Sequence, residues 1–410
     1  MEFTLEHRLQ KRSQTQSLMK DHGIQTWVLW VEDNAAEDAH LPLIGAPYGS
    51  ARKAYIITPE RAVSICPEIE AKLQADAGFE VISVPDRNVI GPFGQHFKEI
   101  AGGRPTPIAL NYSGTFGALD TLGFGNYQKI REAISRQYFF PVPQDAFVSA
   151  DRVIIDAASA KLPFEIELLR EAAQLTYKVL DEGFRQLRAG MTEKDAAAVF
   201  HRLAEEEMGK NKAIGYSWKK EYNPIVLTGE GIAGSPHAAP SDRVIVPGST
   251  VYIDFGLSMH RYGGDLQHFG YVLKEGEAVA PPEIQRMYEI LVNSIHAGMK
   301  AAVPGVPGWV VDTASRKIIT DAGYPSFKHG TGHQLGAGNT HAPGAAFALQ
   351  YTQDGRESPE ACLPIRKGFV MTIEPRMQVT NGASIEVDGV ITDNGFELLA
   401  PLQEEIYLIR

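Results

Sequence analysis

Two segments rich in β-branched and aromatic residues follow each other closely in the chain: Val251-Tyr-Ile-Asp-Phe-Gly256 and Asp265-Leu-Gln-His-Phe-Gly-Tyr-Val-Leu273. This composition is typical of buried strands. Tyr262-Gly-Gly264 precedes the second segment and predicts a hairpin-like turn, so we expect the two strands to pair antiparallel. That pairing would bring Asp254 and Asp265, eleven residues apart, to one place.

A second expected strand pair presents one glutamate from each strand. The two segments are Phe369-Val-Met-Thr-Ile-Glu374 and Ala383-Ser-Ile-Glu-Val-Asp-Gly-Val-Ile-Thr392, which contains Glu386. Between the two strand pairs, His329-Gly-Thr-Gly-His333 offers two histidines in a glycine-rich stretch whose backbone can bend tightly. Four carboxylates and an imidazole form a hard, anionic donor set, which suits Mn²⁺, Co²⁺ or Zn²⁺ and can neutralise two divalent ions.

These motifs resemble the pita-bread metallopeptidase family, which includes methionine aminopeptidase, aminopeptidase P, prolidase and the metal-free creatinase. The resemblance covers roughly residues 160–410 and includes both the Asp-to-Asp spacing and the His-Gly-x-Gly-His signature. It implies a centre of two divalent metal ions, with Mn²⁺ favoured and Co²⁺ or Zn²⁺ as alternatives. The ligands that the resemblance implies are Asp254, Asp265, His333, Glu374 and Glu386.

The resemblance also implies which residues carry the reaction, the hydrolysis of an amide bond by a hydroxide that bridges the two metal ions. Glu374 occupies the position of the general acid/base. His237 and His341 occupy the positions of two histidines that contact the substrate, although the spacing from His333 to His341 is one residue longer than usual. The alternative for each of these two histidines is an ordinary imidazole in a loop.

Three positions near the expected site depart from the family pattern. Asp265 is followed by Leu-Gln-His268 instead of a sequence with arginine, and Ser384 precedes Glu386 where an arginine is common. Arg376 stands where glycine is frequent. Since an arginine that binds a carboxylate is not replaced by histidine or serine without changing recognition, a free C-terminus would need another partner, such as Arg376. We expect three residues to contact the substrate or to support the ligands: His329, Arg376 and His268.

The chain is long enough for two domains. Residues 1–155 alternate strand-like and helix-like stretches, which predicts an α/β domain; it resembles the creatinase-type N-terminal domain. The expected strands are 26–31, 53–58, 80–84 and 107–112. For residues 160–410 we expect an α+β pita-bread catalytic domain, with a curved, mostly antiparallel sheet covered by helices. The expected helices begin near residue 163, at the capping box Thr192–Asp195 and near residue 281, and a fourth ends near Gly323.

Composition excludes several classes of partner. The net charge of −11, without a cluster of Lys and Arg, argues against nucleic acid. No apolar run approaches ~18 residues and the N-terminus lacks an apolar export segment, so we expect no membrane insertion and a cytoplasmic location. Cys66 and Cys362 are far apart, which indicates reduced thiols.

Within the family, a sizeable N-terminal domain implies aminopeptidase P, prolidase or creatinase, and proline after the scissile bond. The sequence therefore predicts an Xaa-Pro dipeptidase or Xaa-Pro aminopeptidase that acts on proline-containing peptides and, by resemblance, forms a homodimer. Two alternatives stay open. One is an amidohydrolase of the creatinase or ectoine hydrolase type that acts on a small metabolite. The other is a binding protein that has kept the fold without catalysis.

Overall fold

The computed structural model describes residues 3–33, 40–103, 107–139, 142–235, 238–338, 340–352 and 354–410. The chain forms two compact units, Glu2–Ala158 and Ser159–Arg410. Each unit has buried hydrophobic cores of its own. None of the helices in the described ranges combines the length and the apolar character that a membrane span requires.

The N-terminal unit contains a six-stranded mixed sheet in the order β4-β3-β2-β1-β5-β6. Its strands are β1 (Thr26–Val31), β2 (Lys53–Ile57), β3 (Ala62–Pro67), β4 (Glu80–Val84), β5 (Ile108–Leu110) and β6 (Phe147–Ser149). The four predicted strands are confirmed as β1, β2, β4 and β5, and the structure adds β3 and β6. The helices are α1 (Leu5–Asp21), α2 (Glu68–Asp76), α3 (Ile90–Ile100), α4 (Phe124–Ser135) and α5 (Asp151–Ser159).

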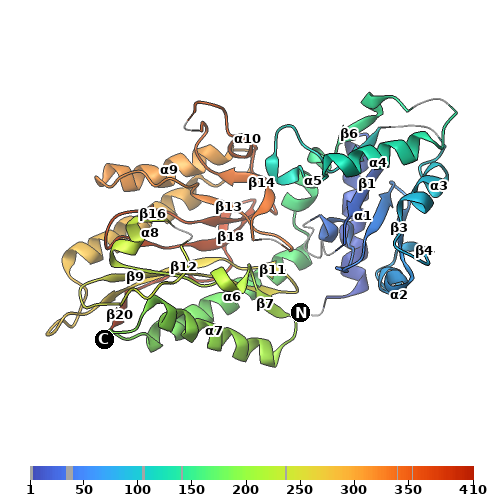
Figure 1. The fold of residues 1–410 in the computed structure, drawn as a ribbon. Helices are drawn as coiled ribbons and strands as arrows, with labels where there is room; N and C mark the ends of the chain where they lie inside the picture. The colour runs from blue at the N-terminus through green and yellow to red at the C-terminus, as the bar shows by residue number, and fades with distance from the viewer. Residues whose placement is uncertain are drawn as a thin grey trace. The chain divides into compact units, whose positions relative to one another are not determined.

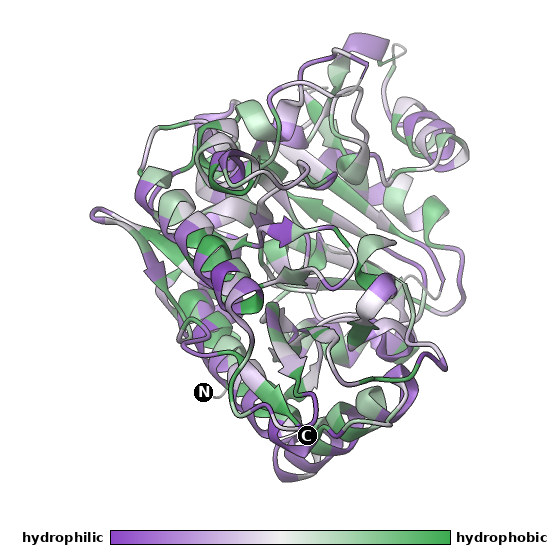
Figure 2. Ribbon diagram, turned by 90° about the vertical axis from the view of Figure 1, so that its left-hand side faces the viewer, coloured by the Kyte–Doolittle hydropathy of each residue, from purple (hydrophilic) through white to green (hydrophobic). Residues whose placement is uncertain are grey.

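Both faces of the central strands β1 and β2 are buried, which is why these strands are mostly hydrophobic, whereas the edge strand β4 is partly exposed. Along β1, Trp27 and Leu29 belong to one core and Val28 to the other, because successive residues of a strand face opposite sides. Figure 2 shows helices on which hydrophilic and hydrophobic residues alternate along their length. The predicted α/β character of this unit is confirmed.

The C-terminal unit is built on two larger sheets with the orders β20-β12-β9-β8 and β14-β13-β15-β18-β19. The strands of these sheets are β8 (Ile225–Thr228), β9 (Thr250–Phe255), β12 (Leu266–Val272), β13 (Gly332–Gln334), β14 (Ala342–Phe347), β15 (Val370–Ile373), β18 (Val387–Thr392), β19 (Gly395–Leu398) and β20 (Tyr407–Ile409). Short ladders add β7 (Ile214–Tyr216), β10 (Leu257–Met259), β11 (Tyr262–Gly263), β16 (Arg376–Met377) and β17 (Ala383–Ser384). The pairs within these sheets are antiparallel except β12 with β20, as predicted.

Helices pack against both larger sheets (Figure 1). They are α6 (Pro163–Gln186), α7 (Glu193–Lys210), α8 (Pro282–Ala301), α9 (Gly308–Asp321) and the short α10 (Pro359–Cys362). Helices α6 and α7 contact strands of the first sheet, and α8 and α9 contact strands of the second. The predicted capping box opens α7: the Thr192 hydroxyl accepts a hydrogen bond from the Asp195 backbone N–H, and the Asp195 carboxylate accepts one from the Thr192 backbone N–H.

The two predicted strand pairs of this unit are confirmed. Strands β9 and β12 pair antiparallel with Gln267 opposite Asp254, and β15 pairs antiparallel with β18. The predicted turn was misplaced, however. Tyr262 and Gly263 pair with β10, and the chain reverses at His260 and Arg261, whose φ angles are 49° and 70°. A turn at Tyr262–Gly264 was wrong because the glycines there lie in and beside a ladder instead of at its end.

Candidate metal centre

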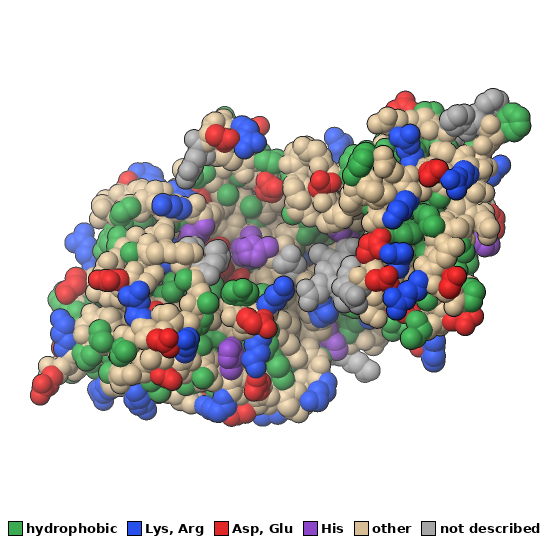
Figure 3. Space-filling model, viewed as in Figure 1, with side chains coloured by type: hydrophobic (Ala, Val, Ile, Leu, Met, Phe, Trp, Pro, Cys, Tyr) green, Lys and Arg blue, Asp and Glu red, His purple; other side chains and the backbone are tan. Residues whose placement is uncertain are grey.

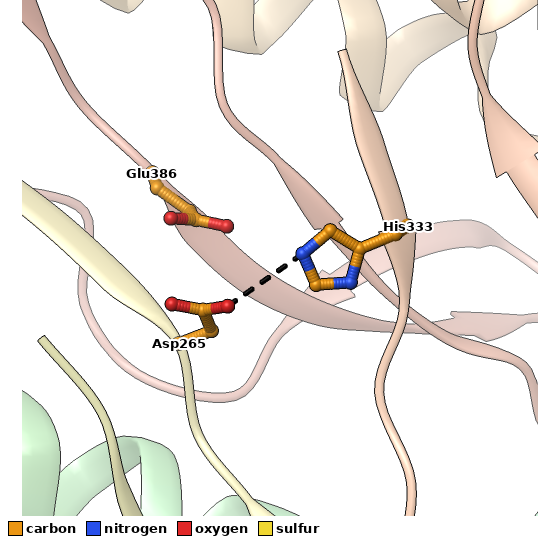
Figure 4. A group of neighbouring side chains, drawn as sticks. All are labelled: Asp265, His333 and Glu386. Atoms are coloured by element: carbon orange, nitrogen blue, oxygen red, sulfur yellow. Dashed lines mark ion pairs between the residues drawn. The ribbon is translucent and has the colours of Figure 1, made fainter. Parts of the chain in front are cut away.

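Three of the expected ligands come together from strands in different parts of the chain. Asp265 directly precedes β12, His333 lies in β13 and Glu386 directly precedes β18. One ligand atom from each of them lies within 4.8 Å of the others. Figure 4 shows the three side chains pointing toward one another, and His333 Nε2 lies 3.6 Å from Asp265 Oδ2.

Gln267 connects the other two expected ligands, Asp254 and Glu374, to each other. Its side-chain Nε2 donates to Asp254 Oδ2 at 3.3 Å and to Glu374 Oε2 at 3.1 Å. Glu374 Oε1 also lies 4.0 Å from His333 Nε2. Together with Asp265, these side chains line a cavity of about 230 Å³. In Figure 3, histidine side chains are visible where the surface of the C-terminal unit is hollowed.

Burial gives these carboxyl groups an unusual affinity for protons. It raises the pKa of Asp265 to about 7, and it raises the pKa values of Asp254, Glu374 and Glu386 well above their ordinary range. Repulsion from the neighbouring carboxylates raises the pKa values of these last three further. The positive charge of a cation among the four groups would offset both effects, because it favours the ionised carboxylates.

The oxygens of this cluster fit a metal site. Within the described part of the chain, Asp254 Oδ1, Asp265 Oδ1 and both carboxylate oxygens of Glu386 are buried without a hydrogen-bond partner. Leaving such groups unpaired is costly, and divalent cations satisfy carboxylate oxygens directly. His333 Nδ1 lies 3.2 Å from its Gln334 carbonyl oxygen, so an Nδ1–H donor would leave Nε2 as the ligand atom.

Backbone and side-chain hydrogen bonds from neighbouring strands fix the ligands. The Glu374 N–H donates to the Thr331 carbonyl oxygen at 2.7 Å, and the Glu386 N–H donates to the Gln267 carbonyl oxygen at 2.9 Å. Such contacts set the direction in which each side chain leaves the backbone, so the site is held by the sheets and not by the ligands alone.

Residues that the sequence analysis did not single out also support the site. Gln267 bridges two ligands, Asp388 Oδ2 accepts a hydrogen bond from the Asp265 N–H at 3.0 Å, and Tyr252 donates its hydroxyl to Asp254 Oδ2 at 3.2 Å. Each stands two residues from an expected ligand. Since residues two apart in a strand share a face, this spacing could have indicated from the sequence that the three residues lie beside the expected ligands.

Comparison with known proteins identifies the family. The sequence model of metallopeptidase family M24 matches residues 167–393, which is more than half of the chain. The chain belongs to metallopeptidase family M24. An uncharacterized peptidase of Staphylococcus haemolyticus is 32% identical over 252 residues, or 61% of this chain and 64% of that protein. An uncharacterized peptidase of Staphylococcus aureus is 29% identical over 258 residues, or 62% of this chain and 66% of that protein. The chain thus matches slightly less than two thirds of the length of each relative.

Solved structures confirm the M24 fold over both units. The X-Pro aminopeptidase of Thermotoga maritima superposes with a TM-score of 0.75 at 23% identity and covers 96% of this chain and 100% of its own. The Xaa-Pro dipeptidase of Bacillus anthracis also superposes with a TM-score of 0.75, at 22% identity, and the match covers 98% of this chain and 100% of that one. At these identities the likeness concerns the fold, and it confirms the predicted pita-bread architecture with an N-terminal domain.

Two of the four other histidines expected in this M24 site lie beside its expected ligands. His341 is exposed and stacks on His333, with ring centroids 3.8 Å apart. His329 Nδ1 lies 4.0 Å from Glu374 Oε2 and 2.7 Å from the Gly330 carbonyl oxygen. Both line the cavity. His237, expected to be catalytic, lies outside the residues that the structure describes.

Arg376 and His268 differ in their relation to the M24 centre. Arg376 is buried at the cavity, where its guanidinium lies 5.0 Å from the Tyr252 ring and donates to the Ile232 carbonyl oxygen at 2.8 Å. His268 lies on the opposite face of β12 from Gln267, with its ring 5.2 Å from Tyr177, and burial lowers its pKa to about 3. The expectation that His268 contacts the site is therefore corrected, because strand alternation turns its side chain away from the cavity.

Proposed function

We propose that this protein is a metal-dependent peptidase that hydrolyses the bond preceding proline, as an Xaa-Pro dipeptidase or Xaa-Pro aminopeptidase. The convergence of Asp254, Asp265, Glu374 and His333 on one cavity is the observation that carries the proposal. Glu386 adds a fourth carboxylate, with a ligand atom within 4.8 Å of those of Asp265 and His333. The names of the M24 relatives and of the similar structures support peptide hydrolysis and the preference for proline.

Two divalent cations would be held by Asp254, Asp265, His333, Glu374 and Glu386. When bound, the ions would lower the pKa of a water molecule and polarise the scissile carbonyl group. Glu374 lines the cavity, and its Oε2 is held by Gln267. We assign Glu374 the role of taking the proton from the attacking water at a carboxylate oxygen and passing it to the leaving nitrogen.

Histidines at the cavity would orient the substrate. The exposed ring of His341, stacked on His333, can donate a hydrogen bond to the carbonyl oxygen on which negative charge develops. We assign His237 a similar role by resemblance. Because these donors stabilise charge that is present only during the reaction, their loss should lower kcat more than it raises KM.

The test starts from protein treated with a chelator and then supplied with Mn²⁺. We expect metal-restored hydrolysis of an Xaa-Pro dipeptide or an Xaa-Pro tripeptide, and little hydrolysis of an Xaa-Ala control. Glu374→Gln should lower kcat by at least about 100-fold, because removal of a general acid/base costs roughly that much. Its melting curve in chelator should remain a single cooperative transition, since glutamine keeps the shape of the side chain.

If none of the peptides is hydrolysed while Mn²⁺ is measurably bound, the peptidase proposal is contradicted. Creatine and small-metabolite amides belong in the same assay, because Ser384 stands where an arginine that could bind the carboxylate of a peptide substrate is common. The Ser384 hydroxyl instead donates to the Pro375 carbonyl oxygen at 3.0 Å. Hydrolysis of such an amide alone would favour the amidohydrolase alternative.

We also propose Mn²⁺ as the native metal and a homodimer as the assembly, both from the family resemblance, and the cytoplasm as the location, because Cys66 and Cys362 indicate reduced thiols. Metal analysis of protein purified without added metal tests the first. Light scattering on the full chain tests the second, and cell fractionation tests the third.

A further inference from the structure

A buried ion pair on helix α9 holds the segment that leads into the candidate metal centre. Asp312 and Arg316 stand four residues apart on this helix and are almost completely buried, with 0% and 7% of their surfaces accessible. The Arg316 guanidinium donates to both carboxylate oxygens of Asp312, at 2.6 and 2.8 Å. We propose that these two residues position Glu374 and His329 for the reaction. This inference rests on the proposed peptidase function and adds two positioning residues to it.

Arg316 holds the backbone of the segment that carries His329. Residues 322–331 lie between α9 and β13 and form neither helix nor strand, so their backbone groups need partners outside regular structure. Arg316 donates to the Phe327 carbonyl oxygen and, at 2.8 Å, to the His329 carbonyl oxygen. Its guanidinium also lies over the Phe327 ring, 3.8 Å from the ring centroid. One side chain therefore fixes the backbone on both sides of Lys328.

Asp312 holds the next part of the same segment and, through it, Glu374. Asp312 Oδ1 accepts hydrogen bonds from the Thr331 backbone N–H at 3.0 Å and from the Thr331 hydroxyl at 2.7 Å. The Thr331 carbonyl oxygen in turn accepts the Glu374 backbone N–H at 2.7 Å. Hydrogen bonds to an ionised carboxylate are stronger than those between neutral groups. A short chain of hydrogen bonds thus runs from α9 to the residue that we assign as general acid/base.

The two positioned side chains meet at the cavity. His329 and Glu374 both line it, and His329 Nδ1 lies 4.0 Å from Glu374 Oε2. Arg316 holds the backbone of the histidine, and Asp312 holds that of the glutamate through Thr331. The ion pair therefore sets the distance between the two side chains. A displacement of about 1 Å at such a site can lower a rate by about 100-fold.

The burial of this pair is explained by the backbone that it holds. A buried ion pair often stabilises a fold no more than apolar residues of similar volume do, so packing alone gives little reason to place one on α9. The same helix carries a second pair with the same spacing, Lys317 and Asp321, whose side chains are 66% and 59% exposed. This exposed pair is the matched control for the buried one.

The main test is the double variant Asp312→Leu/Arg316→Met in the full chain loaded with Mn²⁺. Because both charges are replaced by apolar side chains, no unpaired charge stays buried and the fold should be retained. We expect kcat for an Xaa-Pro substrate to fall by about 10- to 100-fold, with a much smaller change in KM. Mn²⁺ affinity, measured by calorimetry, should fall by about tenfold, because Glu374 is also a proposed ligand.

A pair of milder variants tests the step through Thr331. Thr331→Val keeps the shape of the side chain but removes the hydroxyl that donates to Asp312, so we expect kcat to fall by about tenfold, the effect of one hydrogen bond to a charged group. Thr331→Ser keeps the hydroxyl and should retain the kcat of the wild type. Equal kcat values in Thr331→Val and Thr331→Ser would overturn the proposed step.

Two controls on α9 separate positioning from a general loss of stability. Ile319→Ala truncates a fully buried side chain of the core and should lower the melting temperature without changing kcat or Mn²⁺ affinity. Lys317→Met removes the exposed pair and should behave like the wild type in both measurements. If Ile319→Ala lowers kcat as much as the double variant does, or if the double variant keeps the wild-type kcat, the positioning role is overturned.

Hydrogen exchange in the metal-free protein separates this inference from the proposed function. In the double variant, the amides of residues 327–333 and of Glu374 should exchange at least about tenfold faster than in the wild type, and those of β9 should be unchanged. If the wild type cleaves Xaa-Pro peptides but this local exchange is the same in both proteins, the positioning role is overturned and the peptidase proposal stands. If no peptide is cleaved but local exchange is faster and Mn²⁺ binds more weakly, the positioning of Glu374 stands and the peptidase proposal fails.

Discussion

At the scale of single residues, the proposed metal ligands depend on polar partners in the neighbouring strands. Asp388 is fully buried on β18 and accepts the N–H of Asp265. It stands opposite Thr372 in the β15–β18 register, and the Thr372 hydroxyl accepts the His333 N–H at 3.2 Å. One strand pair therefore orients two ligands through side chains that need not touch a metal ion.

We expect Asp388→Ala to weaken Mn²⁺ binding by about 10- to 100-fold, because the backbone that carries Asp265 loses its acceptor. Asp388→Asn keeps an acceptor oxygen in the same place, so its affinity should remain close to that of the wild type. Calorimetric titration with Mn²⁺ checks both variants. An equal loss of Mn²⁺ affinity in the two variants would show that the affinity depends on the charge of Asp388 and not on its hydrogen bond.

His268 should make stability depend on pH in a way that is separate from the metal centre. Burial lowers its folded pKa from 6.5 to about 3, whereas the unfolded chain protonates normally. The unfolded state therefore binds more protons below pH 6.5, and stability is lost as the pH falls through that value. Between pH 7 and pH 5 the loss due to His268 should be about 2 kcal/mol.

His268→Gln removes this titration. We expect the variant to lose about 2 kcal/mol less free energy of unfolding than the wild type between pH 7 and pH 5. Urea unfolding of both metal-free proteins at the two pH values gives the difference, in which the contributions of the other groups cancel. Identical losses would mean that His268 is protonated in the folded protein.

At the scale of elements, the position of His333 depends on how closely β13 approaches β15. A Cβ atom on Gly332 would lie 2.0 Å from the Thr372 carbonyl oxygen, a distance that backbone atoms cannot tolerate. The glycine before His333 is thus required by the contact between two strands. Its mutation tests whether the strand spacing sets the ligand geometry.

Gly332→Ala should push β13 away from β15, displace His333 and reduce Mn²⁺ affinity and peptide hydrolysis by at least about tenfold. Gly209→Ala, in α7, is the matched control: its Cβ would meet no atom within 4 Å, and alanine favours a helix. Metal titration, hydrolysis and melting curves of both variants check this. Normal Mn²⁺ affinity in Gly332→Ala would contradict the role given to the strand spacing.

At the scale of the whole molecule, repulsion among the carboxylates of the acidic centre destabilises the folded protein, and a bound metal ion would reduce this repulsion. Burial raises the pKa of Asp265 to about 7 and those of the other carboxyl ligands as well, so without metal the folded protein holds protons that the unfolded chain releases. Stability from these groups is present at pH 4 and is lost as the pH rises toward 7.

We therefore expect Mn²⁺ to stabilise the protein strongly near pH 7. At 100 times its dissociation constant, the ion should add about 2.7 kcal/mol, and chelator should reverse the gain. In chelator, Asp265→Asn should lose less stability than the wild type between pH 5 and pH 7. Melting curves with and without Mn²⁺ check the first statement, and an unchanged melting temperature of the wild type on adding Mn²⁺ would contradict it. Melting curves in chelator at pH 5 and pH 7 check the second, and equal losses of stability in the variant and the wild type would contradict it.

The sequence predicted local structure well because hydrophobic periodicity and capping residues act over a few neighbours. The paired strands around Asp254 and Glu374, the α7 capping box and the four N-terminal strands all follow from such patterns. The turn at His260 and Arg261 was missed because two non-glycine residues occupy the left-handed region there, which composition does not indicate.

By itself, the sequence determined the α/β and α+β architecture and the residue types at the five proposed ligand positions, because each is encoded in short motifs. Only the tertiary structure decided that Gln267 bridges Asp254 and Glu374, that Asp388 holds the backbone of Asp265, and that His268 faces away from the site. It alone placed Trp218 against Gly256 beside the ligands. The physical reason is that these contacts join residues on different strands and loops, whose approach is set by the packing of whole sheets and not by any local pattern.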